Sequence, residues 1–166
     1  YSKIEGFAFL PITSFMMALT TFVSQNRGAK EYERARKGAH FGLVCSVSLA
    51  ETIGVLIALF AAPLMRLFVD DPQVIQYGVE RAHYATILFF MLAYSHGVSA
   101  VLRGVGKSVV PMVVMLMCWC LVRVTLLTML NMLFHNILFV YLIYPFTWSL
   151  SSIVFFLYYR KINWQE

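Results

Sequence analysis

The sequence predicts an all-α, polytopic membrane helical bundle with five transmembrane helices. Hydrophobic residues make up 60% of the 166 residues, charged residues make up only 13%, and the mean hydropathy is +0.74. Soluble domains usually contain about half apolar and a quarter charged residues. The apolar residues gather in five segments, each close to the ~20 residues that cross a bilayer as a helix, whereas a transmembrane strand needs only about ten.

We expect the five helices at residues 4–25, 40–66, 73–103, 108–131 and 136–160, within one membrane domain that covers residues 1–166. The first apolar run is short for a span, and the chain starts at Tyr1 without a methionine. We therefore expect the first helix to continue upstream in a longer protein, of which this chain is an incomplete part.

The polar run from Val23 to Gly42 sets the predicted orientation, because it holds five of the thirteen Lys and Arg residues. Basic residues concentrate in cytoplasmic loops, so this run is predicted to lie inside the cell. Alternation of the spans then places nine basic residues inside and three outside, and leaves Arg123 within a span. This pattern favours a multi-pass protein of the cell (inner) membrane with a cytoplasmic C-terminus, surrounded by lipid bilayer. It argues against nucleic-acid binding, which needs a basic surface patch.

Small residues recur every fourth position along the second predicted helix and form a ridge. Such a ridge allows a neighbouring helix to approach closely, although a chance run in an Ala-rich helix gives the same pattern. Its members are Gly38, Gly42, Ser46, Ala50, Gly54, Ala58 and Ala62.

Two connections carry turn signals. Asp71 is placed to cap a helix that begins with Pro72, and this polar helix start is predicted to lie at the outer interface. Gly104 and Gly106 are predicted to turn the chain tightly between the third and fourth helices, which makes these helices antiparallel neighbours.

Two prolines, Pro11 and Pro145, lie deep enough in their spans to remove a backbone hydrogen bond and kink the helix. Broken helices line the pathway of many transporters, and structural kinks are also common in any bundle. Both interpretations stay open from the sequence.

The sequence offers little for an enzyme, a metal site or a cofactor. Cys45, Cys118 and Cys120 lie in apolar runs without metal-ligand spacing, and no Ser/His/Asp order suggests a catalytic triad. An intramembrane enzyme remains the rival class, with His96 and Glu51 as its only candidates.

Ionisable residues at bilayer depth are costly and are therefore functional candidates. Glu51 lies in the second helix on the face of the small ridge, and Arg123 lies in the fourth helix. Their two interpretations are a structural ion pair with each other, or a role in substrate or ion traffic.

Three further candidates lie in the first and third helices. His96, with Ser95 and Ser99, forms a polar patch that either relays protons near neutral pH or hydrogen-bonds a neighbouring helix. Glu5, near the predicted outer mouth, either pairs locally with Lys3 or attracts cations into a cleft.

The run FVSQNRGAKEYERARKG resembles the inner end of the second helix in a lobe of the multidrug and toxic compound extrusion (MATE) transporters. The run VLRGVGKSVVP is similar to the family's turn between the fourth and fifth helices of a lobe, and a Tyr-Pro-Thr-Trp pattern is a third match. The residues that carry the resemblance are Gln25, Asn26, Gly28, Arg103, Gly104, Gly106, Pro111 and Pro145.

The resemblance implies twelve helices in two six-helix lobes, with this chain as helices eight to twelve of the C-terminal lobe and a missing N-terminal lobe as its partner. It implies antiport of organic cationic or amphipathic compounds, coupled to H⁺ or Na⁺, with no other cofactor. The position near Leu92, where some members have a sodium-binding aspartate, is apolar here. A flippase for lipid-linked precursors or polysaccharides, from the same superfamily, is the alternative.

Overall fold

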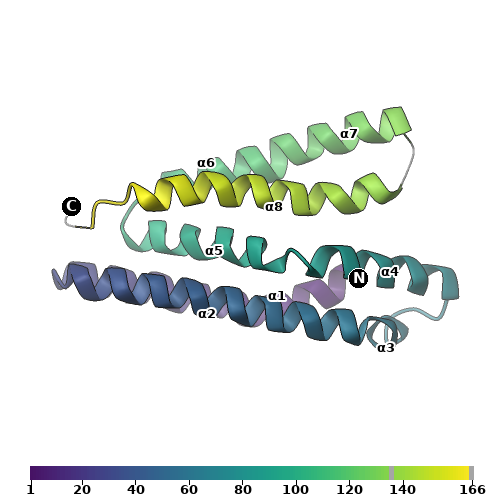
Figure 1. Cartoon of the computed structure of the whole chain (residues 1–166), viewed down its shortest axis with the longest axis horizontal. Helices are drawn as coiled ribbons and strands as arrows, with labels where there is room; N and C mark the ends of the chain where they lie inside the picture. Colours follow the sequence, from purple (N-terminus) through teal and green to yellow (C-terminus); the bar gives the residue numbers. More distant parts are fainter. Residues whose placement is uncertain (135–136, 165–166) are drawn as a thin grey trace.

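The computed structural model describes residues 1–134 and 137–164 and shows an elongated bundle of helices that run along its long axis (Figure 1). Every regular element in this described part is helical. The elements are α1 (Ser2–Gly28), α2 (Tyr32–Leu59), α3 (Ala61–Arg66), α4 (Pro72–Thr86), α5 (Phe89–Gly104), α6 (Val109–Met115), the π-helical segment η1 (Leu116–Val122), α7 (Arg123–Phe134) and α8 (Ile137–Arg160).

Four of these helical stretches are long and apolar enough to cross a membrane. They are Lys3–Gly28, Tyr32–Leu59, Val109–Leu133 and Val140–Arg160. α4 and α5 give a fifth span if the bent pair is counted as one, and they meet at an angle of 57°. The all-α membrane bundle is therefore confirmed, whereas the prediction of one continuous helix over residues 73–103 is wrong.

The first predicted loop is also mostly helical. α2 begins at Tyr32, so only residues 29–31 turn the chain, with Lys30 in the left-handed region at φ 63°. Glu33 and Lys37 pair across one helical turn at 2.7 Å, an arrangement that favours helix in this polar stretch. The hydropathy pattern placed the start of α2 near residue 40 because it detects the apolar span and not the helix.

The ridge of small residues on α2 is a packing surface, as predicted. A Cβ added to Gly42 would lie 2.5 Å from Leu19 Cδ1 on α1, and one added to Gly54 would lie 3.2 Å from Phe89 Cδ2 on α5. Cβ atoms essentially never approach another atom as closely as 2.5 Å and seldom as closely as 3.2 Å, so α1 and α5 come nearer to α2 than larger side chains would readily permit. The buried members are Gly42, Ser46, Ala50 and Gly54.

α5 lies at the centre of the bundle, where it packs against α1, α2 and α8 (Figure 1). Gly106, at φ +81°, makes the turn that follows it, as predicted. Gly104 does not belong to the turn: it is the last residue of α5, and a Cβ there would lie 2.8 Å from Val23 Cβ. α1 and α8 each continue as α-helix through Pro11 and Pro145.

Candidate functional site

Charged and aromatic side chains meet where α1, α4, α8 and the η1–α7 junction converge. We call this set the Tyr144 cluster, because the Tyr144 ring lies between two guanidinium groups: Arg123 Cζ is 4.7 Å and Arg81 Cζ is 5.0 Å from the ring centroid. Cation–π contacts of this kind stabilise a charge that lacks bulk water. The cluster consists of Glu5, Arg81, Trp119, Arg123, Tyr144 and Thr147.

The described residues in close contact with Arg123 are neutral. Its Nη2 and Nε donate to Thr147 Oγ1 at 2.7 and 3.1 Å, and its guanidinium lies 5.1 Å from the Trp119 ring. Within the described residues no carboxylate lies within 4.0 Å of it. A half-buried guanidinium without a carboxylate at contact distance, at the depth of a membrane span, is a functional candidate.

Glu5 and Arg81 form the ion pair of this cluster, at 3.8 Å between Oε2 and Nη2. The separation is too long for a hydrogen bond, and both side chains are mostly buried, at 21% and 25% exposed. Arg81 also lies 4.9 Å from the Tyr1 ring. The predicted local pairing of Glu5 with Lys3 is wrong, because Lys3 instead lies over the Phe68 ring.

The π-helical segment η1 brings two members of the cluster together. Trp119 lies within η1, and Arg123 follows directly at the start of α7. π-Helical turns are uncommon and are found frequently at functional sites. The predicted helix over residues 108–131 therefore exists as one span, but with a wider turn in its middle.

A serine network joins α5 to α8 beside the cluster. Ser95 Oγ lies 2.9 Å from Ser151 Oγ and 2.8 Å from Ser152 Oγ, and Trp119 Nε1 donates to Ser151 Oγ at 3.2 Å. Ser152 in turn donates to the Met91 carbonyl at 2.7 Å. Ser95 therefore has a structural role, because buried hydroxyl groups need such partners.

His96 makes no hydrogen bond to a neighbouring helix in the described part of the chain, and its ring is held by packing instead. Its ring packs edge-to-face on Phe9 and Trp119, each with 5.1 Å between centroids. Its Nε2 is buried without a hydrogen-bond partner there. Ser99 is bonded to Arg103 instead: Arg103 Nη1 donates a hydrogen bond to Ser99 Oγ at 2.7 Å. His96 and Arg103 both line a groove of about 540 Å³ beside α1, together with Thr13, Met16, Met17, Thr20 and Thr21.

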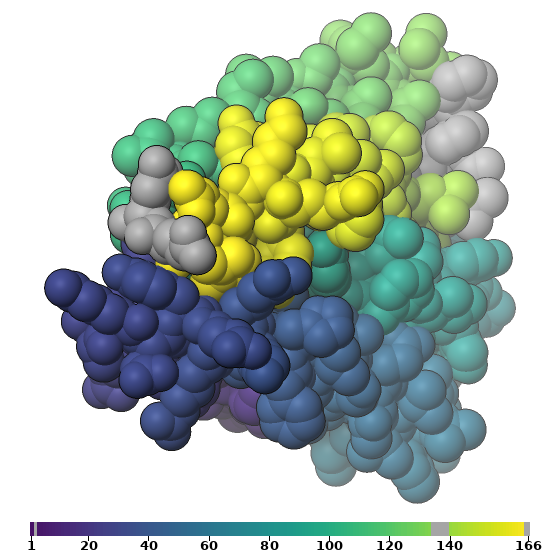
Figure 2. Space-filling view, turned by 60° about the vertical axis from the view of Figure 1, so that its left-hand side comes forward, coloured from purple at the N-terminus to yellow at the C-terminus, as the bar shows by residue number. Residues whose placement is uncertain are grey.

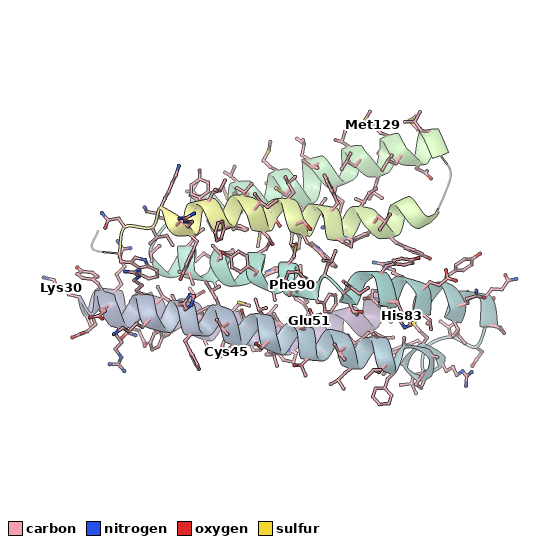
Figure 3. The ribbon with its side chains drawn as sticks, in the orientation of Figure 1. Lys30, Cys45, Glu51, His83, Phe90 and Met129 are labelled. Carbon is pink, nitrogen blue, oxygen red and sulfur yellow. The ribbon has the colours of Figure 1, made fainter. Side chains whose placement is uncertain are left out.

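Glu51 and Arg123 do not form the hypothesised ion pair. Glu51 Oε2 accepts a hydrogen bond from the Phe90 backbone N–H at 3.2 Å, at the break between α4 and α5 (Figure 3). The first N–H groups of a helix lack partners within that helix, and a carboxylate there also interacts favourably with the helix dipole. Glu51 therefore stabilises the start of α5.

We expect the effects of changing Glu51 and Arg123 on stability to add. Glu51→Ala should lower the free energy of unfolding by about 1 kcal/mol, the usual cost of a lost cap. Because the two side chains share no partner in the described structure, Glu51→Ala with Arg123→Met should match the sum of the singles within about 0.5 kcal/mol. Chemical denaturation of the purified full-length protein measures this. The double variant could instead be more stable than the single variant Glu51→Ala, with a change that differs from the sum of the two singles. That result would show that Glu51 and Arg123 do form an ion pair.

A family model described as MatE matches residues 1–129. The chain belongs to this family. It is 30% identical over 112 residues to a probable multidrug resistance protein NorM of Thermotoga maritima, an alignment that covers 68% of this chain and 24% of that relative. It is 29% identical over 101 residues to a second probable NorM, of Chromobacterium violaceum, with 61% and 22% of the two chains covered. A protein named FAD transporter, of Shewanella oneidensis, is 28% identical over 76 residues, with 46% and 17% covered.

The chain thus spans about a quarter of the length of the NorM relatives that it matches. MatE proteins are transporters and not enzymes, and the long apolar helices agree with a multi-pass membrane protein. Within the described residues no group of three or more His, Cys, Asp or Glu side chains is placed to hold a metal ion, and all three cysteines are free.

Most of the residues that carried the MatE resemblance contribute to packing, turns or hydrogen bonds in the structure. Asn26 Nδ2 donates to the Phe22 carbonyl at 2.7 Å, and the adjacent Arg27 donates to the Val105 carbonyl, which ties the α1–α2 turn to the end of α5. Pro111 is buried in α6. Gln25 and Gly28 are exposed, and no contact among the described residues explains them.

Several members of the site were not predicted. Arg81 falls in the helix predicted over residues 73–103 and Tyr144 in the Tyr-Pro-Thr-Trp pattern, but neither was predicted as a site residue. Trp119 was not singled out, although Trp119 and Arg123 are one helical turn apart in the sequence. That i, i+4 spacing of an aromatic and a basic residue was the available signal.

Proposed function

We propose that the whole protein exports organic, cationic or amphipathic compounds across the inner membrane in exchange for H⁺ or Na⁺. This chain contributes part of the C-terminal lobe, and an N-terminal lobe completes the transport pathway. Two relatives that are named probable multidrug resistance proteins support the substrate class. The site supports the coupling, because it holds ionisable groups at membrane depth that no structural pairing fully explains.

The observation that carries this proposal is the loose ion pair of Glu5 and Arg81. At 3.8 Å the two groups attract each other without a hydrogen bond that would fix them. A proton or a sodium ion competes with Arg81 for the carboxylate of Glu5, so occupation by the cation releases Arg81. Because Arg81 belongs to α4 and also lies against Tyr144 of α8, its release changes the packing between these two helices.

A second candidate substrate class is supported by the charges of the Tyr144 cluster. Two arginines face one glutamate there, and no carboxylate of the described residues lies within 4.0 Å of Arg123. A relative of this chain is named FAD transporter, and FAD carries phosphate groups. An aromatic compound with a phosphate or carboxylate group is therefore the alternative substrate, and a flippase for lipid-linked precursors would use the same positive charge.

Accumulation of a panel of cationic dyes in cells that produce the full-length protein tests the proposal. We expect lower accumulation than in empty cells, restored when an ionophore collapses the proton or the sodium gradient. Accumulation equal to that of empty cells for every dye would favour the anionic substrates or the flippase. Low accumulation that persists after both gradients are collapsed would show export that is not coupled to either ion.

The proposed orientation has its own test. The turn after α5, the turn after α1 and the end of α8 lie at one end of the bundle (Figure 1), and we propose that this end is cytoplasmic. A cysteine introduced at Ser108, in a variant without the native cysteines, should react with a membrane-impermeant maleimide only after permeabilisation. A cysteine at Asp70, in the connection before α4, is the matched control and should react in intact cells. Labelling at position 108 in intact cells, with labelling at position 70 only after permeabilisation, would show the opposite orientation.

A further inference from the structure

The first turns of α2 lie beside the last turns of α8 (Figure 2), and a groove runs between them. Its volume is about 900 Å³, and it opens at the end of the bundle that we assign to the cytoplasmic side. Three basic side chains line it, namely Arg36, Lys37 and Arg160, together with the acidic Glu33. Aromatic and aliphatic side chains complete its walls, with Tyr159 and Trp164 in edge-to-face contact at 6.3 Å.

An apolar pocket of about 360 Å³ adjoins this groove on the side of the bilayer centre. The two share His40, Val44 and Tyr159 as lining residues, so they form one continuous surface, the α2/α8 groove. Along α2 the lining runs from Glu33 to Ser48, which is a distance of about 22 Å at the rise of an α-helix. The other walls of the inner part are Leu43, Val47, Tyr94 and Phe156. The groove thus changes from basic to apolar with depth.

The basic end of the α2/α8 groove carries positive charge that its own acid does not neutralise. Glu33 pairs with Lys37 at 2.7 Å. Arg36 and Arg160 form no ion pair within residues 1–134 and 137–164, and Arg160 lies 5.7 Å from the Phe156 ring. Both guanidinium groups are exposed and therefore free to contact an anion.

We propose that the α2/α8 groove binds an anionic phospholipid of the inner leaflet. The headgroup phosphate lies between Arg36 and Arg160, and an acyl chain follows the apolar pocket past Val47 and Phe156. Basic pockets between transmembrane helices on the cytoplasmic side recognise anionic headgroups, and guanidinium groups bind phosphate with charge-assisted hydrogen bonds. Tyr159 and Trp164 belong to the aromatic residues that lie at headgroup level. This site is separate from the Tyr144 cluster and does not depend on the proposed substrate or coupling ion.

Native mass spectrometry of the purified, delipidated full-length protein, titrated with phosphatidylglycerol or phosphatidylcholine, tests this proposal. We expect phosphatidylglycerol to bind more tightly than phosphatidylcholine. Arg36→Gln with Arg160→Gln should weaken phosphatidylglycerol binding about 30-fold. Each basic residue near an anionic membrane raises the affinity about fivefold, and the two factors multiply. The control, Arg34→Gln with Lys107→Gln, removes the same charge from the same end of the bundle outside the groove and should bind like the wild type.

A second variant, Ser48→Trp, tests the apolar part of the groove. Ser48 is exposed, so the indole should fill the pocket without unfolding α2, and it should weaken phosphatidylglycerol binding while all charges remain. Inorganic phosphate should not displace the lipid. Displacement by inorganic phosphate together with unchanged binding by Ser48→Trp would show a site for soluble phosphate compounds. Equal losses in the groove and control variants, or equal affinity for the two lipids, would also overturn the proposal.

Discussion

Replacing Glu5 with glutamine should abolish export by the full-length protein and leave the amount of folded protein near that of the wild type. Glutamine keeps the size of the side chain, but its neutral amide neither binds a proton near neutral pH nor attracts a sodium ion. Stability should change little, because the Glu5–Arg81 contact at 3.8 Å lacks a hydrogen bond and Arg81 keeps its contacts with the Tyr1 and Tyr144 rings when residue 5 is neutral. Dye efflux from loaded cells and the melting temperature in detergent measure the two effects.

The matched control for this prediction is Glu31→Gln. It removes one acidic group from an exposed position directly before α2, outside both the Tyr144 cluster and the α2/α8 groove, and should retain export. Efflux by Glu5→Gln at the wild-type rate would exclude this carboxylate from the coupling. A large fall in melting temperature would instead show that the Glu5–Arg81 pair is structural.

Gly104→Leu should lower the free energy of unfolding by about 3 kcal/mol, the upper range for overpacking a close helix contact. A Cβ at this position would lie 2.8 Å from Val23 Cβ and 2.9 Å from the Thr20 carbonyl oxygen. Because one of these neighbours is backbone, α1 and α5 must separate to accommodate the side chain. Thermal or denaturant unfolding of the purified full-length protein checks this value.

Gly6→Leu is the comparison variant, because an added Cβ at Gly6 meets no atom within 4 Å and the residue lies in the same kind of helix. It should keep or slightly raise stability, since leucine favours helix over glycine by up to about 1 kcal/mol. Equal destabilisation by the two variants would mean that the α1–α5 contact is looser than the structure shows.

The helical membrane fold is predictable from the sequence because its signals are local. A run of about 20 apolar residues forms a helix in a bilayer whatever its neighbours, and the small ridge on α2 directly indicates close packing. The break between α4 and α5 has no such signal, since neither Ile87 nor Leu88 is a glycine or proline. The partner that stabilises this break, Glu51, comes from another helix.

The candidate site was predictable only in part, for the same reason. Ionisable residues such as Glu5 and Arg123 stand out in an apolar sequence, so they were identified as candidates. Their partners depend on which helices are neighbours, which hydropathy does not reveal. Arg81 therefore replaced Lys3 as the partner of Glu5, and aromatic rings replaced Glu51 as the neighbours of Arg123.

Transport by the purified full-length protein in proteoliposomes tests the central claim most directly. A pH gradient or a sodium gradient is imposed separately, and movement of a fluorescent organic cation is followed. Ion-coupled antiport predicts that the dye moves against its own gradient when one of the two is present, and that Glu5→Gln shows no such movement. Dye movement that ignores both gradients, or wild-type movement in Glu5→Gln, would contradict the assignment of coupling to this half of the transporter.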